Sequence, residues 1–333
     1  MSTKKVHLES MVMGIVIALV LVGGAFFVFK EQQAVPVQTV DNNLKRYDVG
    51  GLHHVNEDLI KYKREQKFKT GLKEVWGLVL DEQNELYVCG VGGIEKYTLS
   101  GDKILSMNSD STVRFVGLND KNELLACMGS DILVYDGSGS QIRKIQNSSW
   151  GTLNAVVQKG EFLYVADRAT RLIWKCHLDG KIVKQMGSHL DGGTHNFVIP
   201  GPYMDVSLSP EGNLVTSNPG RHQVNTYSLD GKLLESFGKP SFKHHGFCGC
   251  CNPVALTVLG NGHVVTTEKG ISRVKILDKK GELVGIVAAP KDFRANKHSF
   301  VVDLIEGPKG KIYMLDNATN EVLIYTKKEP DHV

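Results

Sequence analysis

Residues 163–187 read LYVADRATRLIWKCHLDGKIVKQMG, and the organisation of this stretch decides the fold. Residues 212–238, GNLVTSNPGRHQVNTYSLDGKLLESFG, repeat the same pattern. In both stretches an apolar strand leads into a polar turn and a second strand, and a Leu-Asp-Gly-Lys turn then leads into a third. Glycine-containing turns between short apolar strands are typical of antiparallel hairpins, so the pattern predicts a β-sheet unit.

The unit recurs six times when the search is extended in both directions. It occupies residues 75–104, 115–142, 154–183, 204–234, 254–284 and 302–326, and in these longer segments a further apolar strand precedes the others. Six repeats of four antiparallel strands predict an all-β fold, a six-bladed β-propeller. The turn glycines Gly101, Gly139, Gly180, Gly231 and Gly281 lie 38, 41, 51 and 50 residues apart. The extra residues of the later repeats are therefore expected in loops.

The two quoted stretches resemble the NHL repeat, in which Leu-Tyr-Val-Ala-Asp is followed by a polar turn, an apolar strand and Asp-Gly-Lys. The resemblance covers residues 72–326 and is good in repeats three, four and six. It is weaker in repeats one and two, where Gly90 and Met128 stand near the position of the usual Asp. The resemblance implies a six-bladed propeller that most often serves as a binding platform, with enzymes among its structural relatives.

The last repeat ends after its third strand, at Tyr325, while residues 59–70, LIKYKREQKFKT, read like the end of a blade. We therefore expect Lys67 to Thr70 to supply the missing outer strand. Such a strand would close the ring and protect the edges of the sheet.

The N-terminal region predicts a membrane anchor. Residues 11–29, MVMGIVIALVLVGGAFFVF, contain no charge and are long enough to cross a hydrocarbon core of about 30 Å. The run ends in aromatic residues instead of a small-residue cleavage site, which favours an uncleaved signal anchor. Lys4 and Lys5 place the N-terminus in the cytoplasm and the propeller in the periplasm or at the cell exterior. The predicted organisation is a cytoplasmic N-terminus 1–10, a transmembrane helix 11–29, a linker 30–56, the propeller 57–327 and a tail 328–333.

Charge and loop lengths narrow the choice of partner. The 39 basic and 36 acidic residues leave a net charge of +3 with no basic stripe in the propeller, which argues against nucleic acid as a partner.

In a propeller the blade-to-blade links and the turns between the second and third strands share one rim. The long links 186–203, 238–253 and 288–300 are therefore expected together, and protein partners are expected on that rim.

The link KHHGFCGCCNP is the most unusual segment of the chain. The candidate metal or redox residues are Cys248, Cys250, Cys251, His244 and His245, together with Cys89 and Cys127, which are expected to point to the same rim. Three hypotheses stay open: disulfides, with one between Cys250 and Cys251 or from the link to Cys89 or Cys127, a soft-metal centre with iron-sulfur, copper or zinc, and thiol redox chemistry. Cys176 is expected to be a small buried apolar residue.

A second set of candidates occupies matching positions at the ends of second strands. These residues are Asp167, Asn218, Glu268 and Asp316. They could ring the central channel and bind calcium through oxygen ligands, or they could each fix a local turn.

Two classes of function follow from these patterns. The first hypothesis is a membrane-tethered binding or assembly module that works within a membrane redox complex, in electron transport. Under this hypothesis the isolated propeller catalyses no reaction. The alternative is an enzyme. It would be either a calcium-dependent hydrolase using Glu268, Asn218 and Asp316, which a resemblance in architecture to lactonase-type propellers implies, or an oxidoreductase centred on the cysteines or a metal. No G-x-S-x-G elbow, H-E-x-x-H helix or P-loop is present.

Overall fold

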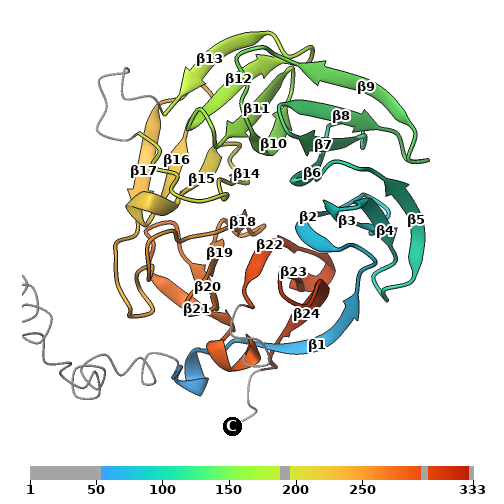
Figure 1. Ribbon diagram of the computed structural model, residues 1–333. Helices are drawn as coiled ribbons and strands as arrows, with labels where there is room; N and C mark the ends of the chain where they lie inside the picture. Colours follow the sequence, from blue (N-terminus) through green and yellow to red (C-terminus); the bar gives the residue numbers. More distant parts are fainter. Residues whose placement is uncertain (1–53, 188–195, 294–298, 330–333) are drawn as a thin grey trace, which may run out of the picture. The chain divides into compact units, whose positions relative to one another are not determined.

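The computed structural model describes residues 54–187, 196–293 and 299–329. Within them, six four-stranded antiparallel sheets are arranged as blades around a central axis (Figure 1). The fold is therefore the six-bladed all-β propeller that the repeats predict. The predicted membrane span 11–29 lies outside the described residues, and among the helices inside them none is both long and apolar enough to cross a bilayer.

Each blade consists of four strands that follow one another from the axis outward. Blades 1 and 2 contain β2 (Glu74–Leu80), β3 (Leu86–Val91), β4 (Gly93–Tyr97), β5 (Lys103–Asn108), β6 (Phe115–Leu118), β7 (Leu124–Met128), β8 (Asp131–Tyr135) and β9 (Gln141–Gln146). Blades 3 and 4 contain β10 (Leu153–Lys159), β11 (Phe162–Asp167), β12 (Leu172–His177), β13 (Ile182–Met186), β14 (Val206–Leu208), β15 (Leu214–Asn218), β16 (Gln223–Tyr227) and β17 (Leu233–Phe237). Blade 5 contains β18 (Leu256–Val258), β19 (Val264–Glu268), β20 (Arg273–Leu277) and β21 (Leu283–Ala288).

Blade 6 combines the two ends of the propeller. It contains β22 (Val301–Glu306), β23 (Ile312–Asp316) and β24 (Glu321–Lys327), with β1 (Tyr62–Lys69) as its outer strand. Strand β1 pairs antiparallel with β24 from Tyr62 opposite Lys327 to Lys69 opposite Glu321 (Figure 1). The predicted closure of the ring is confirmed, although the strand begins at Tyr62, before the predicted Lys67.

Short helical turns complete the secondary structure. They are the 3-10 turns η3 (Glu57–Leu59), η5 (Pro219–Arg221), η6 (Pro290–Phe293) and η7 (Pro308–Gly310).

The core lies between neighbouring blades. Second strands such as β3 are buried along almost their whole length because a blade covers each face, whereas outer strands such as β5 are largely exposed. One apolar cluster joins blades 5 and 6 through Val274, Ile312 and Met314. Another joins blades 1 and 6 through Val88 and Leu315. Burial of apolar area between blades is thus the main source of stability.

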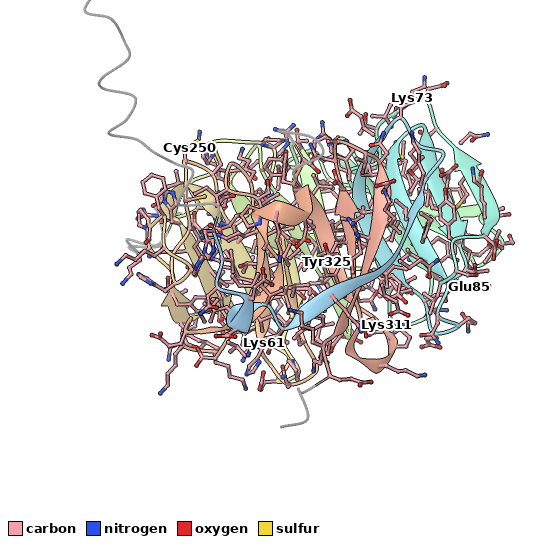
Figure 2. The ribbon with its side chains drawn as sticks, turned by 90° about the horizontal axis from the view of Figure 1, so that it is seen from below. Lys61, Lys73, Glu85, Cys250, Lys311 and Tyr325 are labelled. Carbon is pink, nitrogen blue, oxygen red and sulfur yellow. The ribbon has the colours of Figure 1, made fainter. Side chains whose placement is uncertain are left out.

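The two rims of the ring differ. We call the rim with the links and the turns between second and third strands the link rim, and the opposite one the turn rim. In the side view of Figure 2, Cys250 and Lys73 lie at one rim, while Glu85 and Lys311, from turns between first and second strands, lie toward the other. Cys250 therefore lies on the link rim.

Candidate binding sites on the link rim

Link 238–253 is held by a cluster of buried charges at the start of blade 5. Glu268 ends β19, and Arg273 and Lys275 follow in β20; all three side chains are fully buried. Arg273 donates to both carboxylate oxygens of Glu268, at 2.7 Å from Nε and 3.1 Å from Nη2. Lys275 Nζ lies 3.2 Å from Glu268 Oε2. The carboxylate of Glu268 is thus compensated by two cations.

The same three side chains reach into the link. Glu268 Oε1 accepts a hydrogen bond from the backbone N–H of Cys248 at 2.9 Å. Lys275 donates to the carbonyl of Gly246 at 2.6 Å, and Arg273 Nη1 donates to the carbonyl of Phe242 at 3.2 Å. Because these donors and acceptors are fixed by neighbouring β-strands, the backbone of the link is fixed with them.

The histidines of the link have different surroundings. His244 Nδ1 lies 3.0 Å from Arg273 Nη1, and burial, followed by the charge of Arg273, lowers the pKa of His244. His245 is exposed. His244 is therefore a half-buried residue of the link that contacts the buried cluster through Arg273.

The three cysteines of the link also separate into two groups. Cys248 is 3% exposed, and its thiol contacts the carbonyl of Lys269 at 3.7 Å. Cys250 is exposed, and its Sγ lies 3.1 Å from Sγ of the adjacent Cys251, which is 6% exposed. The structure thus brings Cys250 and Cys251 together as a pair of free thiols.

The structure places Cys89 and Cys127 away from this link. Both are fully buried, Cys89 in the cluster between blades 1 and 2 with Val116 and Ala126, and Cys127 in the cluster between blades 2 and 3. They occupy equivalent positions, as the repeat predicts, but their thiols pack in the core and do not extend to the link rim. Cys176 is likewise buried, as expected. Across the described ranges, no three His, Cys, Asp or Glu side chains are grouped closely enough to hold a metal ion.

The four candidates for a channel cation fasten links to blades. Asp167 accepts hydrogen bonds from Gly151 and Thr152, and Asn218 accepts one from Val198. Asp316 accepts one from Ser299, while Glu268 holds Cys248 as described above. In each case the donor belongs to the link that enters the same blade. These contacts fit the alternative in which each residue fixes the local backbone. A calcium site formed by the four residues stays a prediction.

The channel itself is lined by other residues, which come from the starts of the inner strands. A first ring contributes one equivalent residue from each blade, here called the mouth ring: Trp76, Arg114, Asn154, Met204, Val254 and Val302. A second ring lies one residue further along each strand and includes Phe115, Asp205, Ala255 and Asp303. In blades 1, 3 and 6 the mouth-ring residue lies at a β-bulge, which redirects a side chain. One half of the mouth ring is polar or aromatic and the other half apolar.

The side chain of Tyr203 lines the same cavity in the channel as the two rings. Tyr203 precedes β14 of blade 4, yet its ring centroid lies 6.2 Å from that of Trp76 in blade 1. It also packs edge-on against Phe300, at 5.9 Å, and Lys269 Nζ lies 5.1 Å from its centroid. Three buried polar atoms of the mouth ring, Trp76 Nε1, Arg114 Nη1 and Asn154 Oδ1, have no hydrogen-bond partner among the described residues. Such atoms are rare in proteins and are commonly satisfied by water or a ligand.

Two carboxyl groups, those of Asp205 and Asp303, line the same cavity. Asp205 Oδ2 accepts from the N–H of Leu256 in blade 5, and Asp303 Oδ2 accepts from the N–H of Leu78 in blade 1. Burial raises the pKa of Asp205 to about 7. Burial, followed by the charge of Asp205, raises the pKa of Asp303 as well. Each acid thus joins its blade to the next and favours its protonated form.

Sequence reasoning did not identify the mouth ring, because its six residues differ in type. The available signal was positional: five of the six precede a small or acidic residue that starts the apolar part of the repeat, as in MDVS and VDLI, whereas Arg114 precedes Phe115. Aligning the six repeats column by column and looking for a column with unusual side chains would have found Trp76, Arg114 and Asn154.

Comparisons with known proteins identify the fold. No protein-family model matches the chain, and no curated protein matches it. A catalytically inactive variant of virginiamycin B lyase from Staphylococcus aureus, solved with quinupristin, is 12% identical with a TM-score of 0.57, and the match covers 80% of this chain and 100% of that one. A streptogramin B lyase structure has 13% identity and a TM-score of 0.54, with 83% and 90% covered.

A structure that is not a lyase is similar to the same extent. The WD40 β-propeller domain of Doa1 is 16% identical with a TM-score of 0.54, and the match covers 77% of this chain and 79% of that domain. At these identities the likeness shows the fold alone. The chain is a six-bladed β-propeller, and its function has to be inferred from its own side chains.

Proposed function

We propose that the protein is a membrane-tethered binding module of NHL type, whose propeller lies outside the cytoplasm and binds a protein partner on the link rim. The anchoring of link 238–253 carries this proposal. Buried charges hold the link, while its Phe242 is 59% exposed, more than any other large exposed hydrophobic side chain of the described residues. Buried ion pairs seldom stabilise a fold more than apolar packing would, so we assign this cluster to positioning the link.

An exposed aromatic side chain on an anchored link, such as Phe242, is typical of a protein interface. Aromatic side chains on a rigid support provide most of the binding energy in many interfaces, because little conformational entropy is lost. Cys250 is exposed on the same link, next to the thiol of Cys251. This thiol pair suits a partner in a membrane redox complex, since adjacent thiols can exchange with a partner disulfide.

The tether rests on the 19 uncharged residues 11–29 and the preceding Lys4 and Lys5. Washing membranes at alkaline pH removes peripheral proteins and leaves spanning ones. We expect the intact chain to stay in the pellet. Its release into the soluble fraction would contradict the tether and leave the link-rim proposal standing.

The partner is tested by crosslinking from Cys250. A benzophenone maleimide is attached to the reduced protein in native membranes, and illumination is expected to give one discrete adduct. Phe242→Ala should reduce its yield roughly tenfold when both proteins are diluted below the dissociation constant, the equivalent of about 1.4 kcal/mol. Ile104→Ala, which removes a hydrophobic side chain that is 45% exposed on β5, is the matched control. Equal yields for the two variants would contradict the proposal.

An enzyme is the second candidate, and Asp205 favours it, because a general acid works best when its pKa is near the working pH. However, Asp205 accepts backbone hydrogen bonds from Val206 and Leu256 at its two oxygens, which is a structural arrangement. Elemental analysis separates the metal-dependent versions. Stoichiometric calcium would support a hydrolase, and iron, copper or zinc would support an oxidoreductase centred on the cysteines.

A further inference from the structure

A cavity of about 680 Å³ lies on the link-rim side of blades 2 and 3. Its lining comes from the link before blade 2 (Ser111, Thr112 and Arg114), from the outer strands of blade 2 (Asp131 and Lys144) and from blade 3 (Arg168). The volume is in the range of pockets that hold small molecules, about 300 to 1,000 Å³.

The charges in this cavity are unbalanced. The lining contains the three cations Arg114, Arg168 and Lys144 but only one carboxylate, Asp131. That carboxylate is already bound, because Lys144 Nζ lies 2.9 Å from it and Gln146 donates to it at 2.8 Å. The two guanidinium groups are therefore left without a counter-ion from the lining.

The two arginines are also left without hydrogen-bond partners. Among the described residues, neither guanidinium donates a hydrogen bond or forms an ion pair, and Arg114 Nη1 and Arg168 Nε are buried without a partner. Arg114 stacks on the ring of Trp76, with 3.9 Å between Cζ and the centroid, which holds its guanidinium at the cavity wall. Burial, followed by the charge of Arg168, lowers the pKa of Arg114, so the two groups interact as like charges.

We propose that this cavity binds a small molecule through a doubly charged oxyanion group held between Arg114 and Arg168. A guanidinium presents parallel N–H donors that match the oxygens of a carboxylate or phosphate group, and two adjacent guanidinium groups favour a charge of −2. The hydroxyl groups of Ser111, Thr112 and Thr152 supply further hydrogen-bond partners around the group. The site is separate from the protein interface proposed above and does not depend on the tether.

Isothermal titration calorimetry of the full chain in detergent tests the site with inorganic phosphate, succinate and acetate. Phosphate or succinate is expected to bind at least about tenfold more tightly than the singly charged acetate, and the binding should weaken as sodium chloride is added. Tighter binding of phosphate would identify a phosphoryl ligand and tighter binding of succinate a dicarboxylate. The proposal is overturned if neither dianion binds better than acetate.

Variants locate the binding. Arg168→Gln and Arg114→Gln should each weaken it about 10- to 100-fold, as expected for a lost hydrogen bond between charged groups. Arg143→Gln is the matched control, because Arg143 belongs to β9 of blade 2 but does not line the cavity, and lies 3.7 Å from Glu123. Arg168→Lys keeps the charge and should retain part of the affinity, and circular dichroism verifies the fold of every variant. Equal affinities of Arg168→Gln and Arg143→Gln would refute the assignment.

Discussion

At the scale of single residues, the six cysteines differ in what surrounds them. Cys250 is exposed and adjacent to Cys251, with 3.1 Å between the sulfur atoms. Cys89, Cys127 and Cys176 are buried, and burial raises the pKa of each of these thiols, that of Cys176 to about 12. Because the thiolate is the reactive form, these three thiols should be inert in the folded protein.

We therefore expect a thiol reagent to modify Cys250 first in the native, reduced protein. Mild oxidation by a small disulfide should link Cys250 to Cys251, with the loss of two hydrogen atoms to the reagent, and non-reduced peptide mapping would detect the link. Cys250→Ser is the control and should leave Cys251 unlinked. A disulfide from the link to Cys89 or Cys127 would contradict the packing of those residues.

Residue types explain which site residues could be predicted from the sequence. Cysteines are rare, so Cys248, Cys250 and Cys251 were evident before the fold was known. A pairing of the adjacent Cys250 and Cys251 could be considered from the sequence, but the burial of Cys248 could not be predicted, because it depends on hydrogen bonds to Glu268 at the end of β19 and to Lys269 after it. Arginines are common on surfaces, so Arg114 and Arg168 attract attention only when the fold brings them into one cavity.

At the scale of elements, link 238–253 depends on strands β19 and β20 for its position. Glu268→Gln keeps the shape of the side chain but leaves Arg273 and Lys275 buried without their anion. We expect the free energy of unfolding to fall by about 3 to 5 kcal/mol, the usual cost of removing one partner from a buried ion pair. Urea denaturation followed by circular dichroism measures the change.

The matched control is Glu282→Gln, the same substitution at an exposed position of blade 5. It should leave the midpoint of unfolding in urea unchanged. If the two variants were equally stable, the cluster would not anchor the link, and the rigid display of Phe242 would lose its support.

Strand β1 shows how far an element can be predicted from sequence. The missing fourth strand of the last repeat required a partner, and the chain before blade 1 was the available one, so closure followed from counting strands. The start of the strand was misjudged because Tyr62 to Gln66 are mostly charged or polar. Such residues suit an outer strand, whose side chains are exposed, as β1 confirms.

At the scale of the whole molecule, the ring is held together at its axis by hydrogen bonds between blades. Asp205 joins blade 4 to blade 5, and Asp303 joins blade 6 to blade 1. The spacing of the repeats predicts the ring and the positions of its loops. It does not predict that two acids from distant repeats face one cavity, since that depends on how the strands tilt toward the axis.

These acids give the propeller a characteristic dependence on pH. In the unfolded chain an aspartic acid loses its proton near pH 4, whereas burial raises the pKa of Asp205 to about 7 and that of Asp303 above its usual range. Between these values the folded protein binds more protons than the unfolded chain. The stability that the protonated acids provide is therefore lost as the pH rises through about 7.

We expect the melting temperature, measured by circular dichroism at constant ionic strength, to fall between pH 5 and pH 8. Asp205→Asn should flatten this profile, because it removes one titrating group and relieves the repulsion that Asp303 experiences, even if the lost acceptor for a backbone N–H lowers the whole curve. Asp179→Asn, at an exposed turn before β13, should retain the wild-type slope. A wild-type slope in Asp205→Asn would show that the two acids do not titrate in this range and that the inter-blade hydrogen bonds are made by carboxylates throughout.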